Sequence, residues 1–154
     1  MVGKALSQVR VEDMRPEDVT DVLSLEHISF TTPWSETLFM NEIFKPGSTP
    51  KVAWLHDKVV GYICVNQVLD EGHILNVTVH PDYRQQGIAS LLICLMLRHL
   101  KDNACKAVYL EVRASNEAAR KMYECAGFTV TGTRKNYYTS PAEDGVVMVL
   151  PITD

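Results

Sequence analysis

The spacing of apolar and polar positions changes several times along the chain, and each change predicts a new structural element. Residues 6–14 alternate as in a half-buried strand, and residues 15–30 carry apolar side chains at helical spacing. A second, short helix is predicted within residues 31–44, where Ser35 is suited to the N-cap. We expect a loop over residues 45–50.

The middle of the chain is richer in strand signals. Residues 51–80 are typical of three consecutive strands, joined by tight connections at 57–58 and 70–72. Pro81 should end the third strand, because proline lacks the N–H that a sheet requires. From residue 87 to about residue 100 the apolar spacing is again helical.

The C-terminal part continues the alternation of element types. We expect a strand over 106–114, a helix over 115–127 that a glycine closes, and strands over 128–138 and 145–152. Residues 139–145 have turn composition. The predicted order is β-α-α-β-β-β-α-β-α-β-β. It favours an α/β (mixed α+β) fold with a mixed sheet and helices on both faces.

Length and charge narrow the class of protein. The 154 residues fit one domain spanning 1–154, and the net charge of −4 with no Lys/Arg run argues against nucleic-acid binding. The longest apolar run has 11 residues, short of the ~20 that cross a bilayer, and residues 1–10 show no secretion signal. We therefore expect a cytoplasmic protein that does not bind membranes.

Cysteine and histidine spacings exclude two kinds of site. The four cysteines form no CxxC pair and lie in segments that we expect in a reduced core. No histidine pattern supports a catalytic cysteine. The five histidines lack the HxH or HxxxH spacing of metal ligands, so we predict no metal site.

One segment has the features of a phosphate site. "VTVHPDYRQQGIAS", residues 77–90, is predicted to be a strand, a loop and the start of a helix, whose free N–H groups favour phosphate. Gly87 removes the Cβ that would block close approach, and Arg84 adds a positive charge. An ordinary strand–loop–helix connection explains the same pattern. The segment is neither a P-loop nor a GxGxxG turn.

Within this segment, "RQQGIA" resembles the [RQ]-x-x-G-x-[GA] pattern of the Gcn5-related N-acetyltransferase (GNAT) superfamily, with Ala89 where many members have Gly. The resemblance implies the GNAT fold and acetyl-CoA as cosubstrate. It also implies that backbone amides of the turn hold the pyrophosphate and that strand amides polarise the thioester. The implied cofactor-binding residues are Val77, Thr78, Val79, Arg84, Gln85, Gln86, Gly87, Ile88, Ala89, Ser90 and Asn116.

The segment "LEVRASNEAARKMYECAGF", residues 110–128, looks like the matching block of RimI-type members, which acetylate the N-terminal alanine of a ribosomal protein. "PWSE" and "RKNYY" match the same subgroup. The resemblance implies an acetyl-CoA-dependent protein N-terminal acetyltransferase that works by direct transfer in a ternary complex. Its partner would be the N-terminal peptide of a small-subunit ribosomal protein.

Acetyl transfer to an amine needs a base for the amine and an acid for the thiol. An α-amino group has a pKa of about 7.7–8.0, so most of it is protonated at neutral pH. Glu111 lies in a strand between residues that we expect to be buried, where it is a candidate base or, alternatively, a partner of Arg113 or a cap of a neighbouring element. Tyr123 is a candidate acid or a core aromatic. The resemblance assigns the base to Glu111 and the acid to Tyr123, and gives Asn116 a cofactor contact beside an N-cap role.

The acceptor site is inferred from resemblance alone. Trp34, Tyr137 and Tyr138 are similar to residues that line the peptide groove of N-terminal acetyltransferases, although all three also suit core or edge-strand positions. Two other functions remain open: a GNAT enzyme acting on a small amine or an internal lysine, and a non-catalytic acyl-CoA sensor. The presence of both Glu111 and Tyr123 argues against the sensor.

Overall fold

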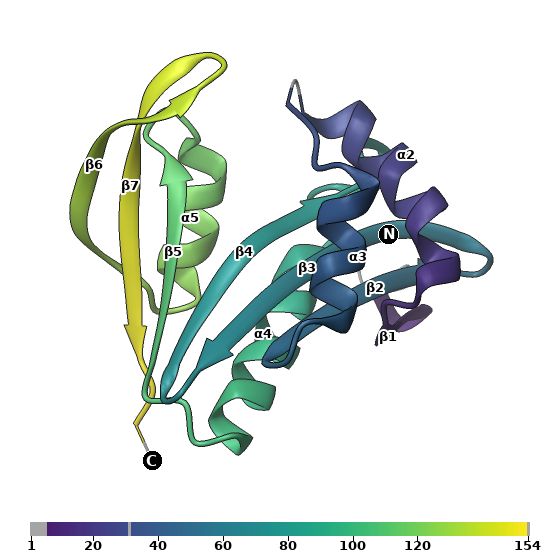
Figure 1. Cartoon of the computed structure of the whole chain (residues 1–154), viewed down its shortest axis with the longest axis horizontal. Coiled ribbons are helices and arrows are strands. Elements are labelled where there is room, and N and C mark those ends of the chain that lie inside the picture. The colour runs from purple at the N-terminus through teal and green to yellow at the C-terminus, as the bar shows by residue number, and fades with distance from the viewer. Residues whose placement is uncertain (1–5, 31, 154) are drawn as a thin grey trace.

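The computed structural model describes residues 6–30 and 32–153, and its elements follow the predicted order (Figure 1). Two 3₁₀ turns, Pro16–Asp18 and Pro81–Tyr83, precede α2 and α4. The helices and strands are β1 (Val9–Asp13), α2 (Val19–Ser29), α3 (Glu36–Phe44), β2 (Ser48–Leu55), β3 (Lys58–Val68), β4 (Glu71–Val79), α4 (Ile88–Asp102), β5 (Ala107–Arg113), α5 (Glu117–Cys125), β6 (Thr129–Thr139) and β7 (Ala142–Pro151).

The described strands form one mixed sheet in the order β1-β2-β3-β4-β5-β7-β6. Five of the six neighbouring pairs of described strands are antiparallel, and three of these are hairpins. In contrast, β4 and β5 run parallel because α4 carries the chain back between them. The predicted mixed sheet is therefore confirmed.

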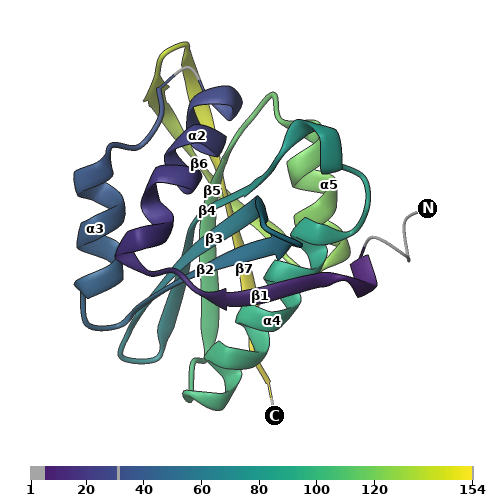
Figure 2. The same ribbon diagram turned by 90° about the vertical axis from the view of Figure 1, so that its right-hand side faces the viewer.

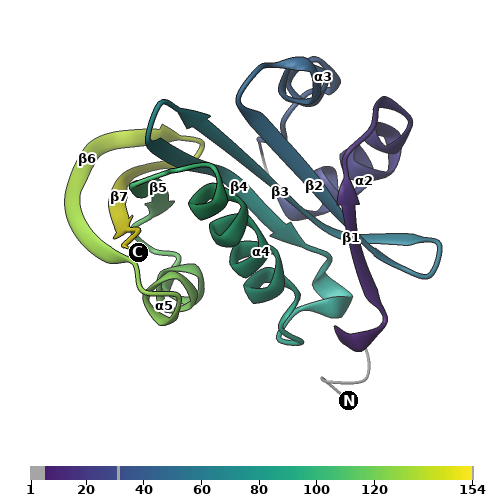
Figure 3. The same cartoon turned by 90° about the horizontal axis from the view of Figure 1, so that it is seen from below.

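Helices cover both faces of the sheet, as predicted (Figures 2 and 3). Helices α2 and α3 lie on one face, where Val22, Phe39 and Tyr62 belong to one buried cluster. Helices α4 and α5 lie on the other face over a larger cluster that includes Leu92 and Leu110. Two separate cores thus hold the sheet from opposite sides.

Local signals position the helix ends. The Ser35 hydroxyl accepts the N–H of Leu38 at 3.2 Å, and the Asn116 side chain accepts the N–H of Ala119 at 3.1 Å. Caps of this kind stabilise a helix by about 1 kcal/mol. Gly127 follows α5 with φ +105°, the left-handed conformation expected of a C′ glycine. These predictions are confirmed.

Several predicted boundaries are wrong. The first strand is shorter than 6–14, since residues 6 and 7 are helical. The predicted loop 45–50 ends at residue 47, because β2 begins at Ser48 and continues through Pro50. Proline is tolerated at position 50 because the edge on which its N–H is missing faces β1. Strand β1 has already ended there, at Asp13, which pairs with Lys51.

The predicted turns also differ from the structure. The turn-like region 139–145 lies mostly within the β6–β7 hairpin, so that only Ser140 and Pro141 separate the two strands. Cross-strand pairing overrides local composition in this hairpin. The earlier hairpins turn one or two residues before the predicted positions, at His56 and Leu69, both with φ +55°.

The cysteine prediction is correct for only two residues. Cys64 and Cys105 are buried, whereas Cys94 and Cys125 are exposed on the outer faces of α4 and α5. All four thiols are free. No described helix is long and apolar enough to span a membrane. The prediction about a secretion signal concerns residues 1–10, of which 1–5 lie outside the described residues.

Candidate active site

The central feature of the sheet is a fork between β4 and β5. Their pairing ends at His73, which lies opposite Tyr109, and beyond it the two strands diverge (Figure 1). The β3–β4 register shifts between Cys64 and Val65, so that β4 carries one extra residue, Leu75, at this point. A bulge bends a strand. This bulge accounts for the fork, because it bends β4, which stays paired with β3, away from β5, which pairs with β7.

Backbone groups of β4 are directed into the fork. His80 donates its N–H to Val60 O at 2.8 Å, and antiparallel partners alternate between bonded and non-bonded pairs. The N–H and C=O of Val77 and Val79 therefore point away from β3. Arg84 Nε, which donates to Val79 O at 3.0 Å, approaches from that side. These groups are free to face a ligand in the fork, and the pantetheine contacts of Val77 and Val79 stay a prediction.

Thr78 differs from its two neighbours. It lies opposite Tyr62 at a bonded position, so its N–H is directed to β3 and its side chain is buried. The structure contradicts the prediction that its amide serves the cosubstrate, because the alternation along a strand gives this amide to the neighbouring strand.

The start of α4 has free backbone amides. Gly87 is the N-cap residue with φ +86°, a left-handed conformation that glycine adopts without strain, and no described side chain caps the helix. Its carbonyl accepts the N–H of Leu91, so the amides of residues 88–90 have no partner within the helix. The buried side chain of Ile88 anchors this turn in the core. Free amides of this kind suit a pyrophosphate, whose binding here stays a prediction.

The other residues of this turn lie at the surface. Arg84, Gln85 and Ser90 are exposed, and Gln86 and Ala89 are half-buried. Gln85 also has a positive φ of +61°. Arg84 donates to the backbone of β4 through its Nε, and its outer guanidinium nitrogens have no hydrogen-bond partner among the described residues.

A cleft of about 460 Å³ opens at the fork. It brings together seven predicted site residues from five elements or loops. They are Trp34, Val77, Glu111, Asn116, Tyr123, Tyr137 and Tyr138. The turn at residues 84–90 is not part of its lining. Folding thus places the predicted base, acid and acceptor residues around one space, with the pyrophosphate turn outside it.

Glu111 lies in β5 between buried Leu110 and Val112, as predicted. Its side chain is only 10% exposed. The carboxylate contacts His73 Nε2 at 2.6 Å through Oε2 and Arg134 Nη2 at 3.6 Å through Oε1. The alternative pairing with Arg113 is wrong, because Arg113 is bound to another carboxylate.

Tyr123 lies on α5 with 7% of its surface exposed. Its ring packs edge-on against Phe128, with centroids 5.8 Å apart. Burial raises the pKa of Tyr123 to about 12, so the hydroxyl remains protonated at neutral pH. Tyr123 therefore belongs both to the core and to the cleft, and Asn116 likewise both caps α5 and lines the cleft.

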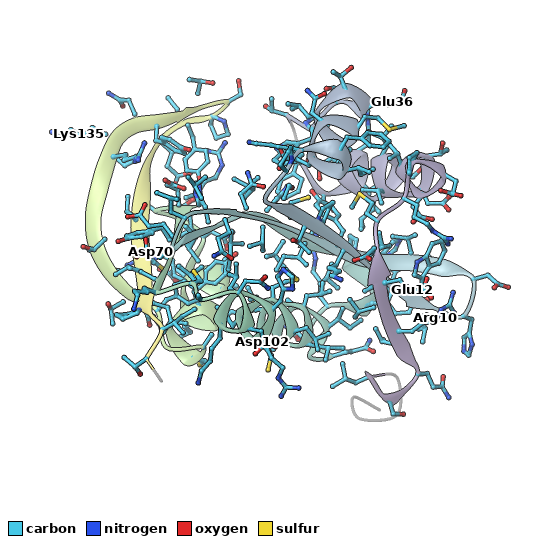
Figure 4. The ribbon with its side chains drawn as sticks, turned by 60° about the horizontal axis from the view of Figure 1, so that its bottom comes forward. Arg10, Glu12, Glu36, Asp70, Asp102 and Lys135 are labelled. Carbon is cyan, nitrogen blue, oxygen red and sulfur yellow. The ribbon has the colours of Figure 1, made fainter. Side chains whose placement is uncertain are left out.

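The β6–β7 hairpin forms one wall of the cleft. The rings of Tyr137 and Tyr138 meet edge-on at 5.0 Å. Arg113 stacks on Tyr138 at 4.3 Å, pairs with Glu143 at 3.2 Å, and donates to the carbonyls of Pro141 at 2.9 Å and Ser140 at 3.1 Å. This arginine ties the hairpin to the end of β5. Lys135, at the bend of β6, points away from the cleft (Figure 4).

The opposite wall contains Trp34. Its ring packs against Phe39 with centroids 5.2 Å apart, and it also lines the cleft. Trp34 is thus a packing residue that also faces the cleft, and its contact with an acceptor peptide stays a prediction.

A buried polar network that was not predicted from the sequence lies behind Trp34. Glu26 is 1% exposed, accepts the Trp34 N–H at 2.9 Å, and accepts the hydroxyl of Tyr62, which in turn accepts the amide of Asn76 at 2.5 Å. Burial raises the pKa of Glu26. The sequence does indicate that Glu26 is buried, because it follows Val22 by four residues and Val19 by seven, on the apolar face of the helix.

His73 was also missed, because no local pattern distinguishes it. It contacts Glu111 only because β4 and β5 lie side by side.

Among residues 6–30 and 32–153 no group of three His, Cys, Asp or Glu side chains is arranged to hold a metal ion.

Comparisons with known proteins agree with this geometry. The model of the acetyltransferase (GNAT) family matches residues 17–128. A Bacillus subtilis (strain 168) protein, provisionally named a ribosomal protein bS18-alanine N-acetyltransferase, is 32% identical over 149 residues, which are 96% of this chain and 99% of that protein.

Two solved structures are similar over nearly the whole chain. The crystal structure of the ribosomal-protein-S18-alanine N-acetyltransferase from Escherichia coli has a TM-score of 0.88 at 30% identity and covers 95% of both chains. Arabidopsis thaliana Naa50, in complex with the bisubstrate analogue CoA-Ac-MVNAL, has a TM-score of 0.82 at 26% identity, covering 94% of this chain and 99% of that one.

Proposed function

Because the chain belongs to the GNAT family and is therefore an acetyl-CoA-dependent N-acetyltransferase, we propose that it acetylates the N-terminal α-amine of a protein. We further propose that the acceptor is the N-terminal alanine of ribosomal protein bS18, the substrate in the names of the relatives. The observation that carries the proposal is the cleft, where Glu111 and Tyr123 face one space between two aromatic walls.

The cosubstrate would lie in the fork. Acetyl-CoA supplies an activated acetyl thioester. The amides of residues 87–90 at the start of α4 would hold its pyrophosphate, together with Arg84, Gln85 and Gln86. The outward-facing N–H groups of Val77 and Val79 would bind the pantetheine arm and polarise the thioester carbonyl. Asn116 lies where it can contact the cosubstrate from α5.

Glu111 would take the proton from the α-ammonium group and free the amine for direct attack in a ternary complex. Tyr123 would donate its hydroxyl proton to the departing sulfur, which suits a hydroxyl that burial keeps protonated. Trp34, Tyr137 and Tyr138 would hold the first residues of the acceptor peptide from opposite sides.

A peptide library with varied first residues tests the acceptor. With acetyl-CoA present, mass spectrometry should find the acetyl group on the α-amine of peptides that begin with alanine, and most rapidly on the bS18 sequence. Products on lysine side chains or small amines alone would refute the proposal. Tight acetyl-CoA binding without any product would favour the sensor.

Glu111→Gln tests the base. We expect kcat to fall by about 10²-fold or more, the usual contribution of a general base, while acetyl-CoA affinity stays within about twofold. Calorimetric titration gives the affinity and initial rates give kcat. Wild-type kcat across the pH range would remove Glu111 from the mechanism.

A further inference from the structure

His73 is the closest polar neighbour of the proposed base. Its Nε2 lies 2.6 Å from Glu111 Oε2, whereas the only other cation contacting that carboxylate in the described part of the chain, Arg134, is 3.6 Å away. The contact between His73 and Glu111 is a short hydrogen bond whose proton either group can carry, depending on the tautomer of the imidazole ring. It joins two groups that can both exchange protons.

The two partners differ in their access to solvent. The Glu111 side chain is 10% exposed and lines the cleft, whereas the His73 side chain is 39% exposed and does not line it. His73 lies at the closed end of the fork, opposite Tyr109, where β4 and β5 are still paired. Peptide and cosubstrate in the cleft would cover Glu111 but leave His73 in contact with water.

We infer that His73 is the proton exit of the active site, passing to solvent the proton that Glu111 takes from the acceptor amine. The inference rests on the proposed function, in which an α-ammonium group is the proton source. Overall, R-NH₃⁺ and the thioester give the amide, a thiol and one released proton. Of the two protons that leave nitrogen, one balances the proton that Tyr123 gives to sulfur. The other passes from protonated Glu111 to the unprotonated Nε2 of His73, while Nδ1 releases its own proton to water; exchange of the ring protons with water then restores the starting tautomer.

The surroundings of His73 suit this transfer. Its strand neighbours are Asn66 on β3 and Tyr109 on β5, neither of which is charged at neutral pH. On β7 the residue opposite Glu111 is Val147. Arg134, from β6, holds the other carboxylate oxygen and carries a permanent charge that cannot accept a proton. The imidazole ring of His73, unlike the arginine, can accept a proton on one nitrogen and release one from the other.

Two variants separate proton transfer from positioning. His73→Gln keeps a donor that can hold the carboxylate but cannot relay a proton, and His73→Ala leaves a space that free imidazole can enter. His27→Ala, at an exposed position on α2, is the matched control. Circular dichroism and thermal unfolding show whether each variant is folded. Initial rates are measured from about pH 6 to about pH 9, on whichever amine the wild-type protein acetylates.

We expect both His73 variants to lose about tenfold in kcat near neutral pH, less than the ~10²-fold of a complete general base, with both KM values within about twofold of wild type. Added imidazole should restore kcat in His73→Ala several-fold and leave the control unchanged. Wild-type kcat in His73→Gln would overturn the inference, since a hydrogen bond alone would then suffice. So would a loss in His73→Ala that imidazole does not reverse. If the wild-type protein acetylates no amine, the proposed function itself fails, and this inference with it.

Discussion

The role of Tyr123 can be tested by removing one oxygen atom. Tyr123→Phe deletes the hydroxyl and keeps the ring that packs against Phe128. Any change in rate then reports on the hydroxyl, because the apolar contacts of the side chain remain.

The size of the effect follows from the buried position. Full proton transfer from a hydroxyl of pKa about 12 to a thiolate resembling cysteine, near 8.5, is uphill by about 3.5 pKa units, or roughly 5 kcal/mol. Before it gives up this proton, Tyr123 should therefore lower the barrier mainly by a hydrogen bond to the sulfur as its charge develops. Such a bond to a charged partner contributes about 1.5–3 kcal/mol. We predict a 10- to 150-fold loss of kcat by that conversion, about 1.4 kcal/mol per factor of ten.

The release of coenzyme A with a thiol-reactive dye measures this loss. Cys94 and Cys125 are exposed and will also react, so a reaction without acceptor must be subtracted. Because Tyr123 stays protonated until about pH 12, the ratio of wild-type to variant kcat should not change between about pH 7 and about pH 10. Tyr109→Phe, a tyrosine that does not line the cleft, is the matched control.

One result would refute this reasoning. If Tyr123→Phe keeps the wild-type kcat and only its melting temperature changes, Tyr123 is a packing residue and another group must protonate the sulfur. If instead the ratio of wild-type to variant kcat falls steeply below pH 10, the raised pKa of Tyr123 is contradicted.

Three further changes test other parts of the site. Gly87→Ala forces an alanine into φ +86°, which costs about 1–2 kcal/mol, and should lower the melting temperature by a few degrees and weaken acetyl-CoA binding in a calorimetric titration. Arg113→Gln removes the contacts that tie the β6–β7 hairpin to the end of β5. Initial rates should show that the KM of the peptide rises several-fold while the KM of acetyl-CoA does not change. Equal increases in both KM values would contradict a role of the hairpin limited to the acceptor peptide. Glu26 has a raised pKa in the fold, so its stabilising contribution is full at low pH and is lost as pH rises from about 4 through that pKa. In Glu26→Gln, thermal unfolding should therefore depend less on pH between about 4 and 8, and an unchanged dependence would show that Glu26 is not its source.

Local interactions made much of the architecture predictable from the sequence. The caps at Ser35 and Asn116, the break at Pro81 and the left-handed Gly127 each depend on residues within a few positions, so a short segment suffices to recognise them. The order of elements followed from such signals and from periodicity. The roles of Glu111 and Tyr123 required the family resemblance, because one glutamate in a strand and one tyrosine in a helix have no distinctive spacing.

Only the tertiary structure decided how distant residues meet. The fork arises because a bulged β4 remains with β3 while β5 pairs with β7, and no local pattern encodes that separation. The contact of His73 with Glu111 joins residues 38 positions apart, and that of Glu26 with Tyr62 joins residues 36 apart. Such contacts depend on strand register and on the packing of helices across the sheet, which are set by the whole chain. The sequence alone therefore identified the elements and candidate residues, and the fold determined which side chains share a cleft, which are buried, and where a proton can leave.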